Sequence, residues 1–198
     1  MRVLIVGAEG TVGRAAASAL RHHEIVKAGR SSGDVRVDLA DAASIGAMFE
    51  KLGRVDAVVA CAGHVHFGPL ASMSGEQFMG GLSNKLMGQV NLVLIGKNHV
   101  SDNGSFTLTS GVLDRDPIRQ GANAATVNAA LSGFVLSAAI EMPRGIRINV
   151  VSPGLLEASA KKYDGLFPGH EPVSSKRVGL AYVKSVDGAL TGKVIAVG

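Results

Sequence analysis

Apolar runs of strand length recur along the chain and alternate with longer segments of helical periodicity. The strand-length runs cover residues 3–6, 25–28, 35–37, 57–60, 105–109, 146–151 and 194–197. The helical patterns cover residues 11–23, 42–52, 76–100, 122–142 and 174–186. Continuous apolar runs are typical of strands buried on both faces, as in parallel sheets. The alternation predicts an α/β fold with right-handed crossovers: a doubly wound parallel sheet with helices on both faces.

The first junction between strand and helix has the pattern of a nucleotide-binding turn. Gly7, Gly10 and Gly13 form a G-x-x-G-x-x-G motif between the first apolar run and an alanine-rich helical pattern. Such a turn brings backbone N–H groups and a helix N-terminus against a phosphate. Gly7 suits the tight turn, Gly10 lets the backbone approach a pyrophosphate, and Gly13 lets helix and strand pack closely. An ordinary glycine-rich loop is the alternative, and the strand before and helix after favour the nucleotide site.

Composition indicates one core. The 198 residues are 46% hydrophobic but only 4% aromatic, with 26 glycines and no tryptophan. No linker or charge block divides the chain, so we expect a single domain over residues 1–198. A core of Val, Leu, Ile and Ala packed around small residues suits a helix-covered parallel sheet.

Charge and cysteine usage restrict the partners. The net charge is +4, but Lys and Arg are scattered and do not interleave with aromatic residues, so we expect no nucleic-acid partner. A modest positive field also suits an anionic cofactor. Cys61 is the only cysteine, which excludes an intramolecular disulfide. With no signal-peptide pattern and no long apolar segment, we expect a cytoplasmic protein without a membrane partner.

The loop after the second strand indicates which dinucleotide binds. A fold that prefers NAD usually places an acidic residue there for the ribose 2′-hydroxyl. Here Arg30 stands in that place, followed by Ser31 and Ser32. A guanidinium with neighbouring hydroxyls suits a 2′-phosphate, so the loop predicts NADP(H) over NAD(H). A solvated loop arginine is the alternative.

Two further segments fit a cofactor site. Asp38 follows the short third strand, where its carboxylate would accept a hydrogen bond from an adenine amino group or stabilise a turn; both interpretations stay open. Small residues at 60–63 close the fourth strand, as expected where a cofactor crosses close to the backbone.

Together these segments resemble the short-chain dehydrogenase/reductase family over nearly the whole chain. The resemblance also rests on Leu-Thr-Ser-Gly at 108–111, Pro-Arg-Gly-Ile-Arg-Ile-Asn-Val-Val-Ser-Pro-Gly at 143–154 and Thr-Gly-Lys-Val at 191–194. It implies a Rossmann fold whose seven-stranded parallel sheet binds a dinucleotide across its carboxyl edge, and commonly the reduction of a carbonyl. The expected cofactor contacts are Gly7, Glu9, Gly10, Thr11, Val12, Gly13, Arg30, Ser31, Asp38, Leu39, Cys61, Ala62, Gly63, Pro153 and Gly154.

The chain departs from the family at its Tyr-x-x-x-Lys pair, in which tyrosine protonates the carbonyl oxygen and lysine holds the nicotinamide ribose. Ala124 stands at the tyrosine position and Asn128 at the lysine position. The family's Asn-Leu-x-Gly motif reads Lys85-Leu86-Met87-Gly88, so lysine and asparagine have exchanged places. We hypothesise that Lys85 replaces the missing cation, or donates the proton if burial lowers its pKa. Alternatively Asn84 faces the site and Lys85 is solvated.

Ser110 and Tyr163 complete the catalytic candidates, with Lys85 and Asn128. Ser110 ends an apolar strand, where its hydroxyl would bond a carbonyl oxygen or cap the next turn. Tyr163 lies where the family has a mobile lid and would supply the missing acid or simply pack. His64 and His66 are candidates for the substrate pocket. No acidic or cysteine partner completes a metal site with them, so we expect no metal.

The resulting prediction is an NADP(H)-dependent oxidoreductase with a non-standard proton donor, acting on a small carbonyl or alcohol. A non-catalytic NADP(H)-binding sensor or regulatory protein is the alternative, since neither role needs a proton donor. A nucleic-acid-binding module has only the net charge in its favour. We also expect a homodimer or homotetramer through the helices at 76–100 and 122–142, as is common in the family.

Overall fold

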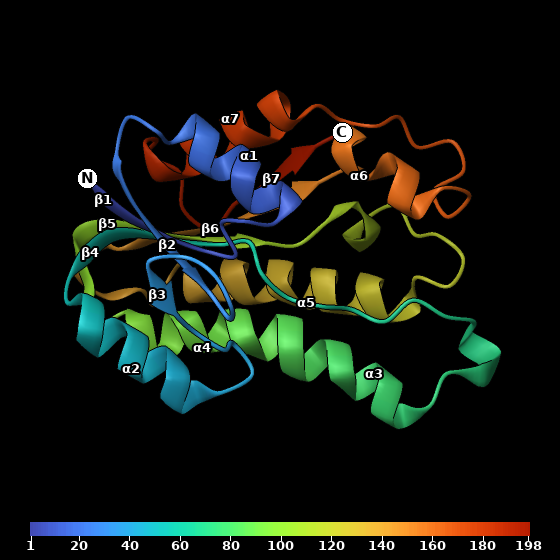
Figure 1. Ribbon diagram of the computed structural model, residues 1–198, viewed down its shortest axis with the longest axis horizontal. Helices are drawn as coiled ribbons and strands as arrows, with labels where there is room; N and C mark the ends of the chain where they lie inside the picture. Colours follow the sequence, from blue (N-terminus) through green and yellow to red (C-terminus); the bar gives the residue numbers. More distant parts are fainter.

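The computed structural model describes all 198 residues as a parallel sheet between two layers of helices (Figure 1). The strand order is β3-β2-β1-β4-β5-β6-β7, and every neighbouring pair is parallel. The strands are β1 Arg2–Val6, β2 Glu24–Gly29, β3 Val35–Arg36, β4 Val55–Ala60, β5 Val100–Thr109, β6 Arg147–Pro153 and β7 Val194–Val197. The order reverses between β1 and β4, which is where open α/β sheets bind ligands, at the carboxyl ends of the strands.

Helices cover both faces of the sheet. In Figure 1, α1, α6 and α7 lie on one face, and α2, α3, α4 and α5 lie on the other. The α-helices are α1 Thr11–Ala19, α2 Ala42–Leu52, α3 Gly75–Gly81, α4 Met87–Gly96, α5 Ala122–Ala138, α6 Glu157–Ala160 and α7 Ser175–Val186. A π-helical turn spans Leu82–Leu86, and 3₁₀ turns span Leu70–Ser72, Val112–Asp114, Pro143–Gly145 and Lys161–Tyr163. None of the helices has the length and apolarity needed to cross a bilayer.

The core has two parts, one on each face of the sheet. A cluster of 24 buried residues lies against α2, α4 and α5, and a cluster of 17 lies against α1 and α7. Alternate residues of one strand enter different clusters: Leu4 belongs to the first and Val3 to the second. Burial on both faces is why the strands read as unbroken apolar runs.

The predicted fold class is confirmed, with strands at all seven predicted positions. The helix predicted over 76–100 is wrong in form: the structure divides it into α3, the π turn and α4, and its last residue already belongs to β5. Two other helices are shorter than predicted: α1 ends at Ala19 and α5 at Ala138. Ala139 and Met142 still pack against the core beyond α5, so apolar periodicity continues after the helical hydrogen bonds end.

Candidate active site

The glycine turn leaves the N-terminus of α1 open to a ligand. Gly7 adopts a left-handed φ of 81°, and its N–H donates to the Ala28 carbonyl at 2.8 Å. A Cβ at Gly13 would overlap the Gly7 carbonyl oxygen, so glycine is what allows α1 to begin here. Gly10 caps the helix without a side-chain hydrogen bond. The first N–H groups of α1 are therefore free to bind an anionic group.

Two cavities meet at the carboxyl edge of the sheet. The smaller, about 200 Å³, lies beside the glycine turn and the end of β2; the larger, about 370 Å³, lies over the ends of β4 and β5. Ala62, Gly63 and His64 line both. Together they form an extended space lined by glycine-turn residues in one part and by every catalytic candidate in the other. A third, separate groove of about 1100 Å³ runs along α1 and α7, and none of the catalytic candidates lines it.

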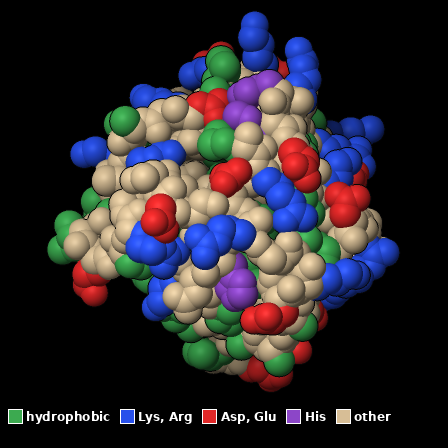
Figure 2. Space-filling model, turned by 90° about the vertical axis from the view of Figure 1, so that its left-hand side faces the viewer, with side chains coloured by type: hydrophobic (Ala, Val, Ile, Leu, Met, Phe, Trp, Pro, Cys, Tyr) green, Lys and Arg blue, Asp and Glu red, His purple; other side chains and the backbone are tan.

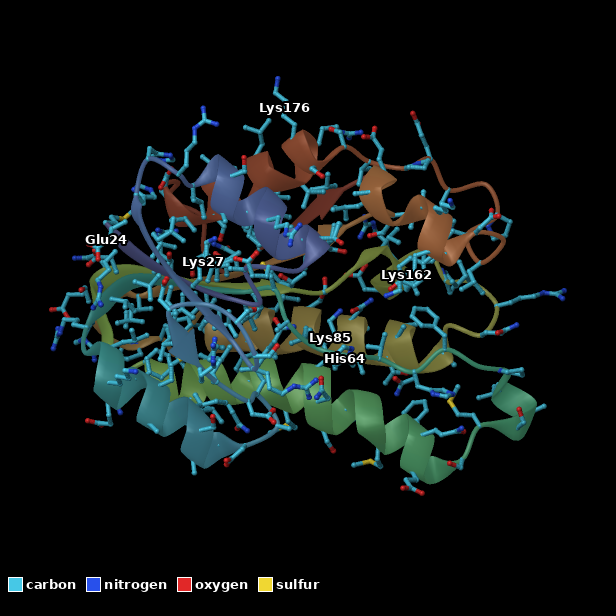
Figure 3. The ribbon with its side chains drawn as sticks, viewed as in Figure 1. Glu24, Lys27, His64, Lys85, Lys162 and Lys176 are labelled. Atoms are coloured by element: carbon cyan, nitrogen blue, oxygen red, sulfur yellow. The ribbon has the colours of Figure 1, made fainter.

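Lys85 points into the larger cavity and is held by two oxygen atoms. Its Nζ donates to Asn128 Oδ1 at 2.7 Å and to the Ser110 carbonyl at 2.9 Å. An ammonium group has three donors, so one N–H is left for a ligand. Burial lowers the pKa of Lys85 to about 8, although the Asp114 carboxylate acts in the opposite direction. Figure 3 shows Lys85 beside His64, near the middle of the molecule.

The π-helical turn and a glycine position this lysine. Lys85 lies within the turn, whose extra residue changes which side chains of the helix face the sheet edge. Asn84 faces the smaller cavity and accepts a hydrogen bond from the His64 N–H at 2.7 Å. Gly63 packs on the lysine stem, where a Cβ would lie 2.6 Å from Lys85 Cγ. Lys85 and Asn84 thus face different cavities, and Lys85 is not a solvated surface lysine.

The two exchanged positions contact each other directly through Lys85 Nζ and Asn128 Oδ1. Ala124, one turn before Asn128 on α5, also lines the larger cavity and is 1% exposed. Its methyl group has no proton to transfer. The other tyrosine, Tyr182, is fully buried, and its hydroxyl bonds Thr109 Oγ1 at 2.7 Å. Burial raises the pKa of Tyr182 well above its ordinary value. Among the catalytic candidates that line this cavity, Lys85, Ser110 and Tyr163 carry a proton that they could transfer.

Asp114, which the sequence did not single out, organises the serines of the site. Its carboxylate accepts hydrogen bonds from the hydroxyls of Ser110 (3.3 Å), Ser132 (3.2 Å) and Ser152 (3.1 Å), and pairs with Arg115 at 3.0 Å. Its side chain is 7% exposed. The Ser110-x-x-x-Asp114 spacing at a strand end is the only sequence signal for it. Asp114 therefore places a negative charge beside Ser110 and near Lys85.

Aromatic rings from two segments line the larger cavity. The Tyr163 ring lies 6.0 Å from the Phe67 ring and 5.9 Å from the Phe167 ring, centre to centre, and all three line the larger cavity. Lys162 Nζ lies 5.2 Å from the centre of the Tyr163 ring. His64 lines the cavity as well, whereas His66 does not. Tyr163 is thus at the cavity wall, packed among other rings.

The other expected cofactor contacts divide between the two cavities. Gly7, Glu9, Gly10, Arg30, Asp38 and Leu39 line the smaller, and Thr11, Val12, Cys61, Pro153 and Gly154 line the larger. Two predicted contacts, Gly13 and Ser31, line neither cavity. Gly13 packs against the glycine turn, and Ser32 lines the smaller cavity where Ser31 was expected.

Two of these side chains, Glu9 and Asp38, have partners within the protein, and a third, Cys61, is uncharged. The Glu9 carboxylate pairs with Lys27 at 3.0 Å and Arg14 at 3.6 Å, and the hydrogen bond from Lys27 lowers the pKa of Glu9. Asp38 Oδ1 accepts from the Ala40 N–H at 3.0 Å, so Asp38 stabilises its turn as well as lining the cavity. Burial raises the pKa of Cys61 to about 11, so it is a neutral thiol. These pairings leave Arg30, which is exposed, as the free cation of the smaller cavity.

The chain is similar to known proteins in sequence and in structure. Residues 6–181 match the sequence profile of the family described as Enoyl-(Acyl carrier protein) reductase. The chain belongs to the short-chain dehydrogenase/reductase family. Among curated family members, the short-chain reductase protein NovJ of Streptomyces niveus is 29% identical over 162 residues. That match covers 79% of the chain and 60% of NovJ, so the chain spans less than two thirds of this relative.

Solved structures share the whole architecture of this short-chain dehydrogenase/reductase. Protein lin1944 from Listeria innocua is 48% identical, with a TM-score of 0.99 and full coverage of both chains. A small-chain dehydrogenase in complex with NADPH is 25% identical, with a TM-score of 0.87, and the match covers 100% of this chain and 96% of that one.

Proposed function

We propose that the protein is an NADP(H)-dependent oxidoreductase for a small carbonyl or alcohol, in which Lys85 transfers the proton. The observation that carries the proposal is the position of the Lys85 ammonium, held by Asn128 and the Ser110 carbonyl inside a cavity at the carboxyl edge of the sheet. No tyrosine stands where the family has its proton donor, and Lys85 fills that need.

The smaller cavity favours NADP(H). The uncapped start of α1 offers N–H donors for a pyrophosphate, and Arg30 lies at the end of β2, where a 2′-phosphate is expected. The two joined cavities give the extended space that a dinucleotide needs. A similar small-chain dehydrogenase binds NADPH, which supports the same cofactor here.

In this proposal, bound NADPH supplies the hydride that goes to the carbonyl carbon. Lys85 donates a proton from its ammonium group to the carbonyl oxygen, which becomes the alcohol, and the neutral amine then takes a proton from water. In the oxidation direction, the neutral amine accepts the proton. The Ser110 hydroxyl adds a donor to the same oxygen when it turns from Asp114. A pKa of about 8 keeps Lys85 mostly protonated near neutral pH and still acidic enough to transfer the proton.

The test is a screen of carbonyl compounds with NADPH, comparing the wild type with Lys85→Met and Ser110→Ala. Loss of the proton donor should lower kcat by about 10²–10⁴-fold, while NADPH still binds. Lys176→Met is the matched control, because Lys176 is exposed and points away from the molecule (Figure 3). Equal turnover by the wild type and Lys85→Met would overturn the assignment of Lys85.

A non-catalytic NADP(H)-binding protein is the second candidate, and Ala124 is the observation that favours it. Ala124 is enclosed in the cavity wall and provides no acid there. This candidate predicts that NADPH raises the melting temperature but that no carbonyl compound is reduced.

A further inference from the structure

We propose that His22, His23 and Asp187 form a binding site for a divalent transition-metal ion of the Zn²⁺ class, separate from the cavity that contains Lys85. The histidines lie in the turn between α1 and β2, and Asp187 directly follows α7. Their ligand atoms all lie within 4.8 Å of one another. This inference does not depend on the oxidoreductase proposal.

Both rings are already directed at the same carboxylate. His23 Nε2 lies 2.7 Å from Asp187 Oδ1, and His22 Nε2 lies 3.0 Å from Asp187 Oδ2. In a tetrahedral zinc site with bonds of about 2.0–2.2 Å, neighbouring ligand atoms are about 3.3 Å apart. A metal ion would therefore enter after each histidine–carboxylate pair opens by about 0.3–0.6 Å.

Backbone hydrogen bonds hold His23 and Asp187 in place from two parts of the chain. The His23 N–H donates to the Leu20 carbonyl at 2.9 Å, and the Asp187 N–H donates to the Val183 carbonyl at 2.8 Å. The His23 side chain is 11% exposed, whereas that of His22 is 51% exposed. The site thus has one enclosed ligand and one ligand open to solvent, which gives an ion a way in and leaves space for water.

Electrostatics at the end of α7 also favour a cation. Asp187 places a carboxylate at a helix C-terminus, where the helix dipole is negative and a carboxylate is unfavourable. Arg147, the nearby guanidinium, donates to the carbonyls of Ser185 and Val186 at 2.6 and 2.8 Å. This guanidinium compensates the end of the helix, and both carboxylate oxygens are left to the two imidazoles, so the charge that a divalent ion would offset is that of Asp187.

The ligand chemistry selects the class of ion. Imidazole nitrogen with one carboxylate suits Zn²⁺ and its neighbours in the transition series, while Mg²⁺ and Ca²⁺ prefer oxygen ligands. Three protein ligands leave one coordination position for water. Bound metal would join the α1–β2 turn to the end of α7, two segments more than 160 residues apart in sequence.

The site lies at the opposite end of the strands from Lys85. Glu24, which follows His23, lies at the left edge of the molecule in Figure 3, whereas Lys85 lies near its middle. Figure 2 shows this end of the molecule, with histidine side chains gathered at the surface beside acidic ones. A metal ion here acts on stability and has no direct contact with the reaction.

Titration of tag-free, chelator-treated protein with Zn²⁺ by calorimetry tests the proposal, using the wild type, His22→Asn, His23→Asn and the control His99→Asn. His99 approaches only Glu50 among the acidic residues, at 3.8 Å. We expect one equivalent to bind to the wild type and the control, and at least about 10-fold weaker binding to each of the other variants. At a hundredfold excess over Kd, Zn²⁺ should raise the wild-type melting temperature by about 5–10 °C, and Mg²⁺ should not.

A second measurement needs no variant: Co²⁺ should selectively broaden the NMR signals of the His22 and His23 rings in the wild type. Absence of Zn²⁺ binding, unchanged affinity in both His22→Asn and His23→Asn, or broadening at other histidines would overturn the proposal. The thermal shift produced by NADPH should be the same with and without Zn²⁺, so this test and the test of the oxidoreductase proposal fail independently.

Discussion

At Lys85, one feature of the candidate site could be predicted from the sequence and another could not. The exchange of lysine and asparagine between two family motifs was visible in the sequence. The direct contact between Lys85 and Asn128 was not, because it depends on a π-helical turn that periodicity does not reveal. Asp114 was missed for a similar reason: its three serine partners come from the residue after β5, from α5 and from β6, and they converge only in the fold.

At this scale, Asp114→Asn should change the pH dependence of the reaction. The Asp114 carboxylate raises the pKa of Lys85, so its removal lets that pKa fall further below about 8. Carbonyl reduction needs protonated Lys85, and its decline at alkaline pH should therefore begin at a lower pH, by up to about 1 unit. The kcat–pH profile measures this. Asp116→Asn, two residues further along, is the control, and an unmoved inflection in Asp114→Asn would contradict the coupling.

Arg30→Ala should separate the two nicotinamide cofactors. Loss of a charge-assisted contact to the 2′-phosphate should weaken NADPH about 10- to 100-fold and leave NADH nearly unchanged. Calorimetric titration with both cofactors provides the comparison. Arg36→Ala serves as control, since Arg36 bonds the Gly33 carbonyl and lines neither cavity. Equal losses for NADPH and NADH would remove the phosphate assignment from Arg30.

Among the elements, the strands were predicted better than the helices, for a physical reason. A strand buried on both faces is mostly apolar, so an apolar run marks its position. The polar residues 101–104 hid the first half of β5, which begins at Val100 and not at the predicted residue 105. Helical periodicity shows which side of a segment is buried, but it does not show where the helical hydrogen bonds change. Residues 76–100 were therefore predicted as one helix, although they contain α3, the π-helical turn and α4. The glycine turn was predictable because its geometry requires glycine at particular positions.

The two glycines at positions 13 and 46 test this view of the elements. Gly13→Ala would press a methyl group into the Gly7 carbonyl. The variant should lose about 1–3 kcal/mol of stability, and it should also bind the cofactor more weakly. Gly46→Ala, in α2 with no atom within 4 Å of the new Cβ, should gain about 0.5–1 kcal/mol. Denaturant unfolding of both variants measures the difference. A neutral Gly13→Ala would show that the turn is not tightly packed.

At the scale of the whole molecule, we propose that α4 and α5 form the interface of a homodimer or homotetramer. Leu94 on α4 is 47% exposed, Leu136 on α5 is 57% exposed, and Ile140 just beyond α5 is 86% exposed. On the face shown in Figure 2, by contrast, basic and acidic side chains are interspersed. Leu136→Arg should lower the mass measured by light scattering to that of one chain, and Leu70→Arg, at another exposed leucine, should not. A monomeric wild type at micromolar concentration would contradict this interface.

The most direct test of the account is NADPH oxidation at 340 nm by the wild type and Lys85→Met, followed from pH 6 to 10 with the best carbonyl compound from the screen. We predict that wild-type kcat declines above about pH 8 as Lys85 loses its proton. Lys85→Met should bind NADPH but turn over about 10²–10⁴-fold more slowly, without that inflection. A wild-type profile shared by Lys85→Met, or NADPH binding without turnover of any compound, would contradict the account.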